Sequence, residues 1–151
     1  MAEKIKTGGC ICGAIRYELD DQPTWNVYCH CESCRKHTGA PVTVLVTCLP
    51  EQVSWSGDLR ARYQSSPDRF RGFCQNCGTS LTWETEIKGS AWLALHVSTL
   101  DAPENYPPTE HVFCENAIEW YVLNDGLPRY PGAKYSEFGV RDSGDNRPAE
   151  K

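Results

Sequence analysis

Hydrophobic and polar residues alternate along much of the chain in short runs, as in A-I-R-Y-E-L (residues 14–19) and S-L-T-W-E (residues 80–84). Alternation with a period of two is the pattern of a half-buried β-strand. Turn-forming residues, such as the double glycine at 8–9, separate the runs. We therefore predict strands at Ala14–Leu19, Thr24–Tyr28, Val42–Cys48, Gln52–Ser56, Arg60–Gln64, Arg69–Phe73, Ser80–Glu84 and Trp92–Val97, and a last strand from about Val112 to Val122.

Helix-forming sequence is scarce. A short helix is predicted from Glu32 to about Thr38, where Gly39 would end it. Many short strands and so little helix indicate a mainly β, antiparallel protein. We expect a single domain over residues 1–135 of the 151-residue chain, followed by a polar, flexible tail over residues 136–151.

Charge and hydropathy narrow the class of protein. A net charge of −5 and a pI of about 5.3 lack the basic footprint of a nucleic-acid-binding domain, so no nucleic-acid partner is expected. No apolar run approaches the ~20 residues that cross a bilayer, so no membrane contact is expected. The first residues, M-A-E-K-I-K-T, carry no apolar signal segment, and we expect a cytoplasmic protein.

Nine cysteines are a high count for a chain of this length. They would suit a disulfide-rich secreted protein, but their number is odd, no secretion signal is evident and they fall in tight groups. Tight spacing suits chelation of a metal by thiolates, and these soft ligands favour zinc over magnesium or calcium. We therefore prefer zinc to disulfides as the explanation.

Two of the cysteine groups look alike, C-I-C-G at residues 10–13 and C-Q-N-C-G at residues 74–78. Glycine permits the backbone angles that let a chelating turn aim its N–H groups at sulfur. Brought together, the two pairs would supply four thiolates to a closed tetrahedral zinc site, which would also stabilise the fold. The alternative is two unrelated pairs of buried thiols.

The third group, C-H-C-E-S-C at residues 29–34, has three cysteines and no glycine directly after it. In an extended segment Cys29 and Cys31 point to the same side, and Cys34 would join them from the first turn of the predicted helix. The helix N-terminus and the basic residues at 35–37 would favour the thiolate form. Three protein ligands with an open fourth position are the pattern of catalytic zinc, and a zinc with three thiolates favours binding a substrate sulfur over activating water.

Other cysteines and histidines are weaker candidates. Cys48 and Cys114 are interpreted as core or half-buried thiols, and His30 could simply point away from the ligands beside it. A lone histidine is more often structural. The histidines that could still serve as a fourth ligand or as a base are His37, His96 and His111.

Four motifs follow one another along the chain: G-G-C-I-C-G-A-I-R-Y, C-H-C-E-S-C-R-K-H-T-G-A-P, F-C-Q-N-C-G-T-S-L-T-W and D-G-L-P-R-Y. In this order and spacing, residues 5–132 resemble the glutathione-dependent formaldehyde-activating enzyme family, which includes the centromere protein V domain. The resemblance implies several coiled antiparallel β-sheets of the Mss4 type and two zinc ions per chain. The ligands it implies are Cys10, Cys12, Cys74 and Cys77 for a structural zinc, and Cys29, Cys31 and Cys34 for an open catalytic zinc.

The resemblance also implies a carbon–sulfur lyase that forms S-(hydroxymethyl)glutathione from glutathione and formaldehyde. The partners of such an enzyme would be an aldehyde and glutathione or a similar small thiol. Association of the chain into a homo-oligomer is left open. Cationic residues would hold the carboxylates of glutathione. The cations available for this are Arg35, Lys36, Arg60, Arg62, Arg69 and Arg71.

Two other functions remain open. The chain could be a glutathione carrier or a zinc-stabilised binding module without catalysis, since glutathione and formaldehyde also react without an enzyme. The C-x-x-C spacing of Cys31 and Cys34 would also suit a metal-free thiol redox protein. Metal content separates the redox protein from the others, and turnover separates an enzyme from a carrier.

Overall fold

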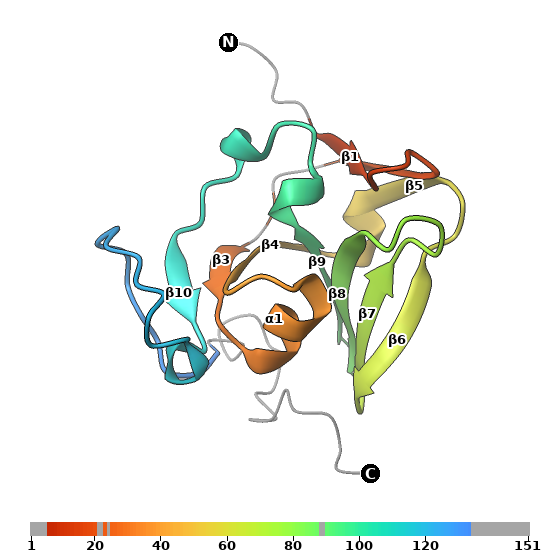
Figure 1. The fold of residues 1–151 in the computed structure, drawn as a ribbon. Coiled ribbons are helices and arrows are strands. Elements are labelled where there is room, and N and C mark those ends of the chain that lie inside the picture. The colour runs from red at the N-terminus through yellow and green to blue at the C-terminus, as the bar shows by residue number, and fades with distance from the viewer. Residues whose placement is uncertain (1–5, 21–22, 24, 88–89, 134–151) are drawn as a thin grey trace.

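A seven-stranded β-sheet forms the centre of the protein, as the computed structural model of the chain shows (Figure 1). The structure describes residues 6–20, 23, 25–87 and 90–133. The strands of this sheet are β3 (Trp25–Cys29), β4 (Thr43–Cys48), β6 (Ala61–Ser66), β7 (Arg69–Phe73), β8 (Ser80–Ile87), β9 (Ser90–His96) and β10 (Glu110–Val112). Their spatial order is β10-β3-β4-β9-β8-β7-β6. Neighbours are antiparallel except β10 and β3, which are parallel.

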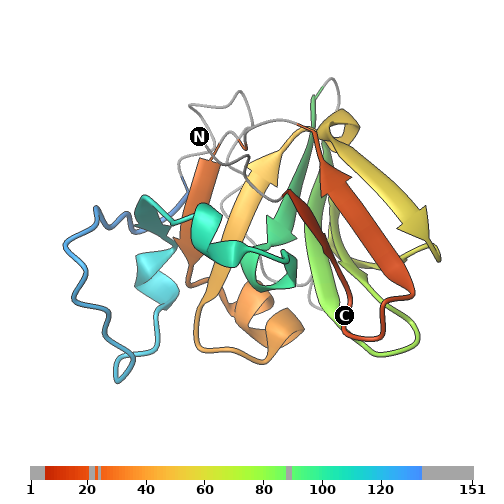
Figure 2. The ribbon, with the colours of Figure 1, turned by 90° about the horizontal axis from the view of Figure 1, so that it is seen from above.

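A smaller antiparallel sheet contains β1 (Thr7–Gly9), β2 (Ile15–Leu19) and β5 (Val53–Gly57), with β2 in the middle. Figure 2 shows β1 and β2 in a layer apart from the large sheet. Asp101, which lies in the chain between β9 and β10 of the large sheet, accepts hydrogen bonds from Thr7 and Arg16 of the small sheet. These contacts connect the two sheets at their surface.

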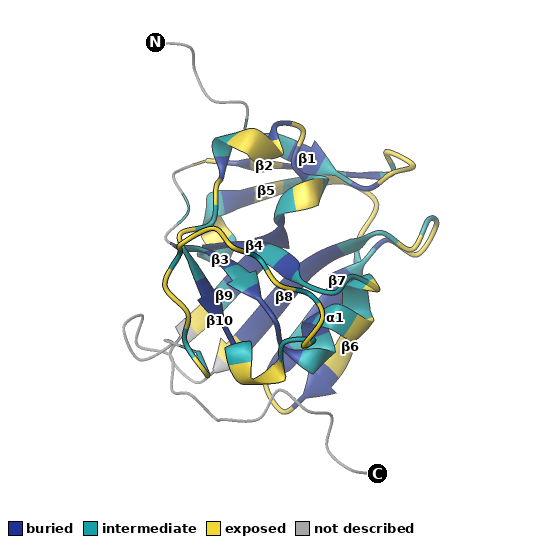
Figure 3. Ribbon diagram, turned by 60° about the vertical axis from the view of Figure 1, so that its left-hand side comes forward, coloured by how far each residue is buried: buried dark blue, intermediate teal, exposed yellow. Residues whose placement is uncertain are grey.

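The two faces of the large sheet carry two hydrophobic cores. The first core includes Leu19 of the small sheet together with Val46 and Leu95 of the large one. The second core, which includes Leu45 and Trp83, lies on the opposite face, because successive residues of a strand point to opposite sides. Figure 3 shows the buried residues along β4, β8 and β9, the middle strands of the large sheet.

Helix α1 (Glu32–Thr38) lies in front of the large sheet in the view of Figure 1. Its Cys34 is buried and belongs to the second core. Its length and its end at Gly39, which has a left-handed backbone with φ of 70°, confirm the predicted helix. None of the described helices is long and apolar enough to cross a membrane. The short 3₁₀ helices are η1 (Pro50–Gln52), η2 (Val97–Thr99), η3 (Pro103–Asn105) and η4 (Cys114–Asn116).

The mainly β fold with unclosed, largely antiparallel sheets confirms the predicted fold class. Each of the eight alternating runs forms a strand, with ends shifted by a few residues. Strand β1 was not predicted, because its sequence T-G-G has the glycines typical of a turn. The expected tail at 136–151 lies outside the described residues.

The predicted last strand, Val112 to Val122, is wrong over most of its length. Strand β10 ends at Val112, because Phe113 adopts a left-handed backbone with φ of 56° and η4 follows. The backbone of residues 128–132 instead pairs with this edge, where Pro128 accepts from the His111 N–H and Tyr130 donates to the His111 carbonyl. Trp120 is 76% exposed, so its alternating surroundings do not reflect a buried strand face.

Candidate metal centres

The first cysteine cluster brings together the two predicted pairs. The sulfurs of Cys10, Cys12, Cys74 and Cys77 all lie within 4.8 Å of one another. The Cys10–Cys12 and Cys12–Cys74 sulfur distances are 3.6 Å and 3.8 Å. Metal–sulfur bonds of ~2.3 Å in a regular tetrahedron set the sulfurs about 3.8 Å apart. The four sulfurs therefore fit a tetrahedral thiolate-bound metal.

Glycine shapes the two turns that carry these sulfurs. Gly13 and Gly78 have φ values of 78° and 75°, and each donates its N–H back to the carbonyl of the first cysteine of its turn. The Thr79 hydroxyl joins the turns, since it accepts from the N–H of Ile11 and lies 3.1 Å from the sulfur of Cys77. The cluster thus connects the β1–β2 turn with the β7–β8 turn.

The second cluster consists of Cys29, Cys31 and Cys34, whose sulfurs also lie within 4.8 Å of one another. Cys29 ends β3, Cys31 caps helix α1 and Cys34 lies in its first turn, so the expected convergence occurs. All three are 2% exposed. Among the described residues, no histidine, carboxylate or further cysteine joins this set within the same distance. The cluster is therefore a buried three-sulfur site.

Arg71 of β7 faces the second cluster. Its Nη1 lies 3.0 Å from the Cys34 sulfur, and its Nε donates to the Ser65 hydroxyl at 3.2 Å. Hydrogen bonds from the Cys29 and Cys31 thiols, with the nearby Arg71 charge, hold the pKa of Cys34 well below its ordinary value although burial opposes this. Cys34 is therefore the sulfur of this cluster most inclined to be a thiolate before any metal binds.

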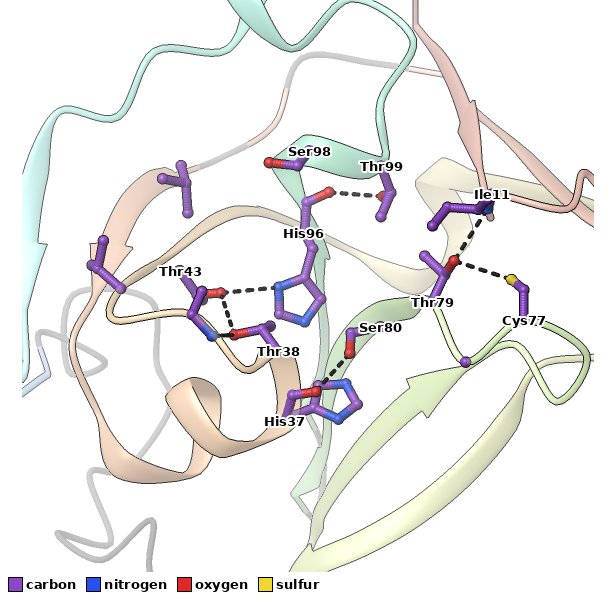
Figure 4. Close-up of a pocket in the computed structure, with 14 residues that line it drawn as sticks. Ile11, His37, Thr38, Thr43, Cys77, Thr79, Ser80, His96, Ser98 and Thr99 are labelled. Carbon is purple, nitrogen blue, oxygen red and sulfur yellow. Dashed lines mark hydrogen bonds between the residues drawn. The ribbon is translucent and has the colours of Figure 1, made fainter.

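A pocket of about 550 Å³ lies between the two clusters. Cys77 of the first cluster and the nearby Thr79 line one side, and His37 and Thr38 of helix α1 line the other (Figure 4). Thr38 donates to the carbonyl of Cys34 at 2.8 Å, so this second wall belongs to the surroundings of the three-sulfur site. A molecule in the pocket would contact Cys77 of the first cluster, whereas Thr38, His37 and His96 would separate it from the buried sulfurs of the second.

Two histidines form the inner wall of this pocket (Figure 4). The rings of His37 and His96 are 5.5 Å apart, and the Nε2 atom of each is buried without a hydrogen-bond partner. Burial lowers the pKa of His37 and lowers that of His96 to about 4. Both rings are therefore neutral at pH 7, each with one N–H and one lone pair.

The strand register brings His96 to this site. Cys29 pairs with Thr43 across β3 and β4, and Leu45 pairs with His96 across β4 and β9. Since residues two apart in a strand share a face, Cys29, Thr43 and His96 lie on the same side of the sheet. The helical spacing of three residues between Cys34 and His37 brings the other histidine to the same region.

The buried His30 and His111 form a separate hydrogen-bonded chain with the exposed Asp125. His30 Nε2 lies 2.9 Å from His111 Nδ1, and His111 Nε2 lies 2.9 Å from the Asp125 carboxylate. Because an ionised carboxylate only accepts, His111 donates from Nε2 and accepts from His30 at Nδ1. Both His111 nitrogens thus have hydrogen-bond partners. The ring connects Asp125, in the D-G-L-P-R-Y segment, to His30, which lies between Cys29 and Cys31, and it does not line the pocket.

The six cations considered for substrate carboxylates have other partners in the structure. Arg35 donates to the backbone carbonyls of His30 and Asn116, and Lys36 pairs with Glu32. None of the six is among the described residues that line the pocket. The others contact protein groups: Arg60 and Arg62 pair with Glu84, Arg69 donates to Thr85, and Arg71 contacts Cys34.

The remaining cysteines lie outside both clusters. Cys48 is fully buried in the first core, donates to the carbonyl of Leu93, and burial raises its pKa to about 12. Cys114 is half-buried at the start of η4. These positions agree with the interpretation of Cys48 as a core thiol and of Cys114 as a cysteine outside the metal centres.

The fold and the two cysteine clusters define a class of mainly β proteins with paired sites that could hold metal ions. The chain belongs to the glutathione-dependent formaldehyde-activating enzyme family, whose sequence pattern matches residues 5–116. A curated relative, named as an uncharacterized lyase of Schizosaccharomyces pombe, is 35% identical over 75 residues, which are 49% of this chain and 53% of the relative. The chain thus spans about half the length of that relative.

The fold also occurs in a solved structure. A crystal structure of a Rhodobacter sphaeroides protein matches 82% of this chain and 99% of its own chain, with a TM-score of 0.51 and 18% sequence identity. At this identity the likeness shows a shared fold.

Proposed function

We propose that the chain is a zinc-dependent carbon–sulfur lyase acting on the adduct of an aldehyde, such as formaldehyde, with glutathione or a similar small thiol. Membership of the family and the lyase name of the relative support an enzyme of this class. The observation that carries the proposal is the three-sulfur cluster beside a pocket, with no fourth protein ligand among the described residues.

The two clusters would have different roles. We assign a structural zinc to Cys10, Cys12, Cys74 and Cys77, because four protein sulfurs leave no position for a substrate. We assign the reactive zinc to Cys29, Cys31 and Cys34. Two zinc ions per chain are therefore expected, and the three-sulfur one should be the more easily removed.

Zinc held by the three sulfurs would supply a fourth position for a thiol sulfur and would lower the pKa of that thiol. The pocket of about 550 Å³ beside the cluster has room for the aldehyde and part of the thiol substrate. The hydroxyls of Thr79 and Ser80 line it and can bind the polar groups of that substrate. Holding both reactants together would supply much of the rate acceleration.

Hydrogen bonds around His96 determine which of its nitrogens is free to act. The Thr38 hydroxyl donates to the Cys34 carbonyl, so its oxygen accepts from the Thr43 hydroxyl at 3.5 Å. The Thr43 oxygen then accepts from His96 Nδ1, also at 3.5 Å. His96 Nε2 is left with its lone pair, buried at the pocket wall.

We assign the proton transfer to His96 Nε2. In the reaction the thiol sulfur forms a bond to the aldehyde carbon, the carbon–oxygen double bond becomes single, and the proton lost by sulfur is delivered to that oxygen. Burial lowers the pKa of His96 to about 4, although the Cys34 charge opposes this. Nε2 would therefore accept a proton only from a thiol that the metal has made acidic, and would release it readily to the oxygen.

Replacing His96 by phenylalanine should lower the rate of adduct formation about 100-fold or more, the size typical of a lost acid–base group. The zinc content should stay at two ions per chain, because His96 is not assigned as a ligand. Ser98→Ala, which alters the same pocket wall outside the hydrogen-bond chain, is the matched control. An unchanged rate, or loss of the second zinc in His96→Phe, would contradict the assignment.

Exchange NMR spectroscopy on glutathione and formaldehyde tests the proposed function. Zinc-loaded protein should interconvert free glutathione and its hydroxymethyl adduct faster than buffer does, in proportion to occupancy of the second zinc site. Calorimetric binding of glutathione with no acceleration would instead support a carrier.

We propose a cytoplasmic location for the reaction, since nine free cysteines suit a reducing compartment.

A further inference from the structure

Arg71 is a buried cation with an unusual set of neighbours. It is 2% exposed and the largest of the fully buried side chains. Within the described part of the chain, no carboxylate lies at salt-bridge distance from it, whereas Arg62 of the adjacent strand β6 and Arg60 just before that strand both pair with Glu84. Arg71 is paired in register with Trp83, so Glu84, the next residue along, points to the opposite face of the sheet.

A buried charge is costly unless an opposite charge accompanies it. The groups that can balance Arg71 are the sulfurs of the second cluster, of which Cys34 lies 3.0 Å from Nη1. Three thiolates on one Zn²⁺ carry a net charge of −1, which a single guanidinium cancels. A thiolate substrate in the fourth position would make the zinc site more negative by one charge. The net charge of that site together with Arg71 would then be −1.

We propose that Arg71 is the counter-charge of the three-cysteine zinc site and that its hydrogen bond protects the Cys34 sulfur from the aldehyde. A hydrogen bond from a cation stabilises a thiolate and so makes it a weaker nucleophile. The Cys31 sulfur also accepts a hydrogen bond, from the backbone N–H of Cys34 at 3.3 Å, which makes it a weaker nucleophile as well. A substrate sulfur in the open position has neither donor, so it would react in preference to these two ligands.

This inference rests on the proposed function, but its test measures zinc binding and cysteine reactivity without the lyase reaction. The test uses the zinc-loaded full chain and its variants Arg71→Met and Arg71→Lys. The control is Arg62→Met, because Arg62 pairs with Glu84 and Glu86 and does not contact the cysteines. Zinc affinity of the weaker site is measured by competition with a chelator. Alkylation of the three cysteines by iodoacetamide at saturating zinc is measured by mass spectrometry, and the zinc retained by the four-cysteine site reports that each variant is folded.

Arg71→Met should weaken zinc binding at the three-cysteine site about 10- to 100-fold, as loss of a partner of a metal ligand does. Alkylation of Cys34 should rise relative to Cys29. Arg71→Lys, which keeps the charge, should stay within about tenfold of wild type in zinc affinity, and this variant decides the question if Arg71→Met does not fold. The control Arg62→Met should match wild type in zinc affinity and in the alkylation of the three cysteines.

Two results would overturn the inference and are distinguishable. Wild-type protein that binds one zinc only would overturn the zinc site and the proposed function together with it. Two zincs in wild type, with unchanged affinity in Arg71→Met or an equal rise in alkylation at all three cysteines, would overturn the role of Arg71 alone.

Discussion

Cys74→Ser should lose the zinc of the four-cysteine site and, with it, the folded state. Structural zinc contributes roughly 10–16 kcal/mol of binding free energy in zinc-finger peptides, and a whole domain is stable by only ~5–15 kcal/mol. Cys74 is 2% exposed and belongs to the first core, so a serine hydroxyl there would also be buried. The β1–β2 and β7–β8 turns would no longer be joined through the metal. Circular dichroism and metal analysis would register both losses.

Cys114→Ser is the matched control, because Cys114 is half-buried and belongs to neither cluster. It should keep two zinc ions and the wild-type melting temperature within a few degrees. The structural assignment would be contradicted if Cys74→Ser melted at the same temperature as Cys114→Ser.

Cys31→Ser should abolish the reaction and leave the fold intact. The substitution leaves two sulfurs for the second zinc, and a serine hydroxyl is a poor ligand at neutral pH. Cys31 is also the N-cap of helix α1, where its side chain accepts from the Cys34 N–H, and serine is among the best residues at that position. Helix α1 should therefore persist, and the variant removes the metal site with little local disruption.

Three measurements together check this prediction. Metal analysis should fall from two zinc ions to one, circular dichroism should match wild type, and exchange spectroscopy should return the rate in buffer alone. Catalysis at the wild-type rate with one zinc would contradict the assignment of the open site. Disappearance of both zincs would mean that the two clusters are not independent.

Local patterns predicted the parts of this fold that depend on neighbours in sequence. Strands such as Arg69–Phe73 follow from alternation, and the helix at Glu32–Thr38 follows from its residue types and the glycine after it. The convergence of Cys29, Cys31 and Cys34 was predictable because a strand end and a helix start fix their directions. The joining of the two glycine-followed pairs was predictable from the number of ligands that zinc requires.

Local sequence patterns could not predict the contacts that depend on tertiary structure. Apolar residues continue past Val112, but the left-handed backbone at Phe113 and pairing with residues 128–132 end the strand there. Arg71 is one of six cations that the sequence offers for substrate carboxylates, because its charge is visible in sequence and its face of the sheet is not. No spacing rule relates His111 to Asp125 or His96 to Thr43, since the path of a loop determines the first contact and strand register the second.

Cadmium NMR of the cadmium-substituted protein tests most directly whether one site is closed and the other takes a thiol. The proposed assignment predicts two resonances in the range of thiolate-bound cadmium. Addition of glutathione should shift one of them toward the position of a four-sulfur site and leave the other unchanged, and Cys31→Ser should lack the responsive resonance. Two resonances that both ignore glutathione, or a single resonance in wild type, would contradict the open zinc site at Cys29, Cys31 and Cys34.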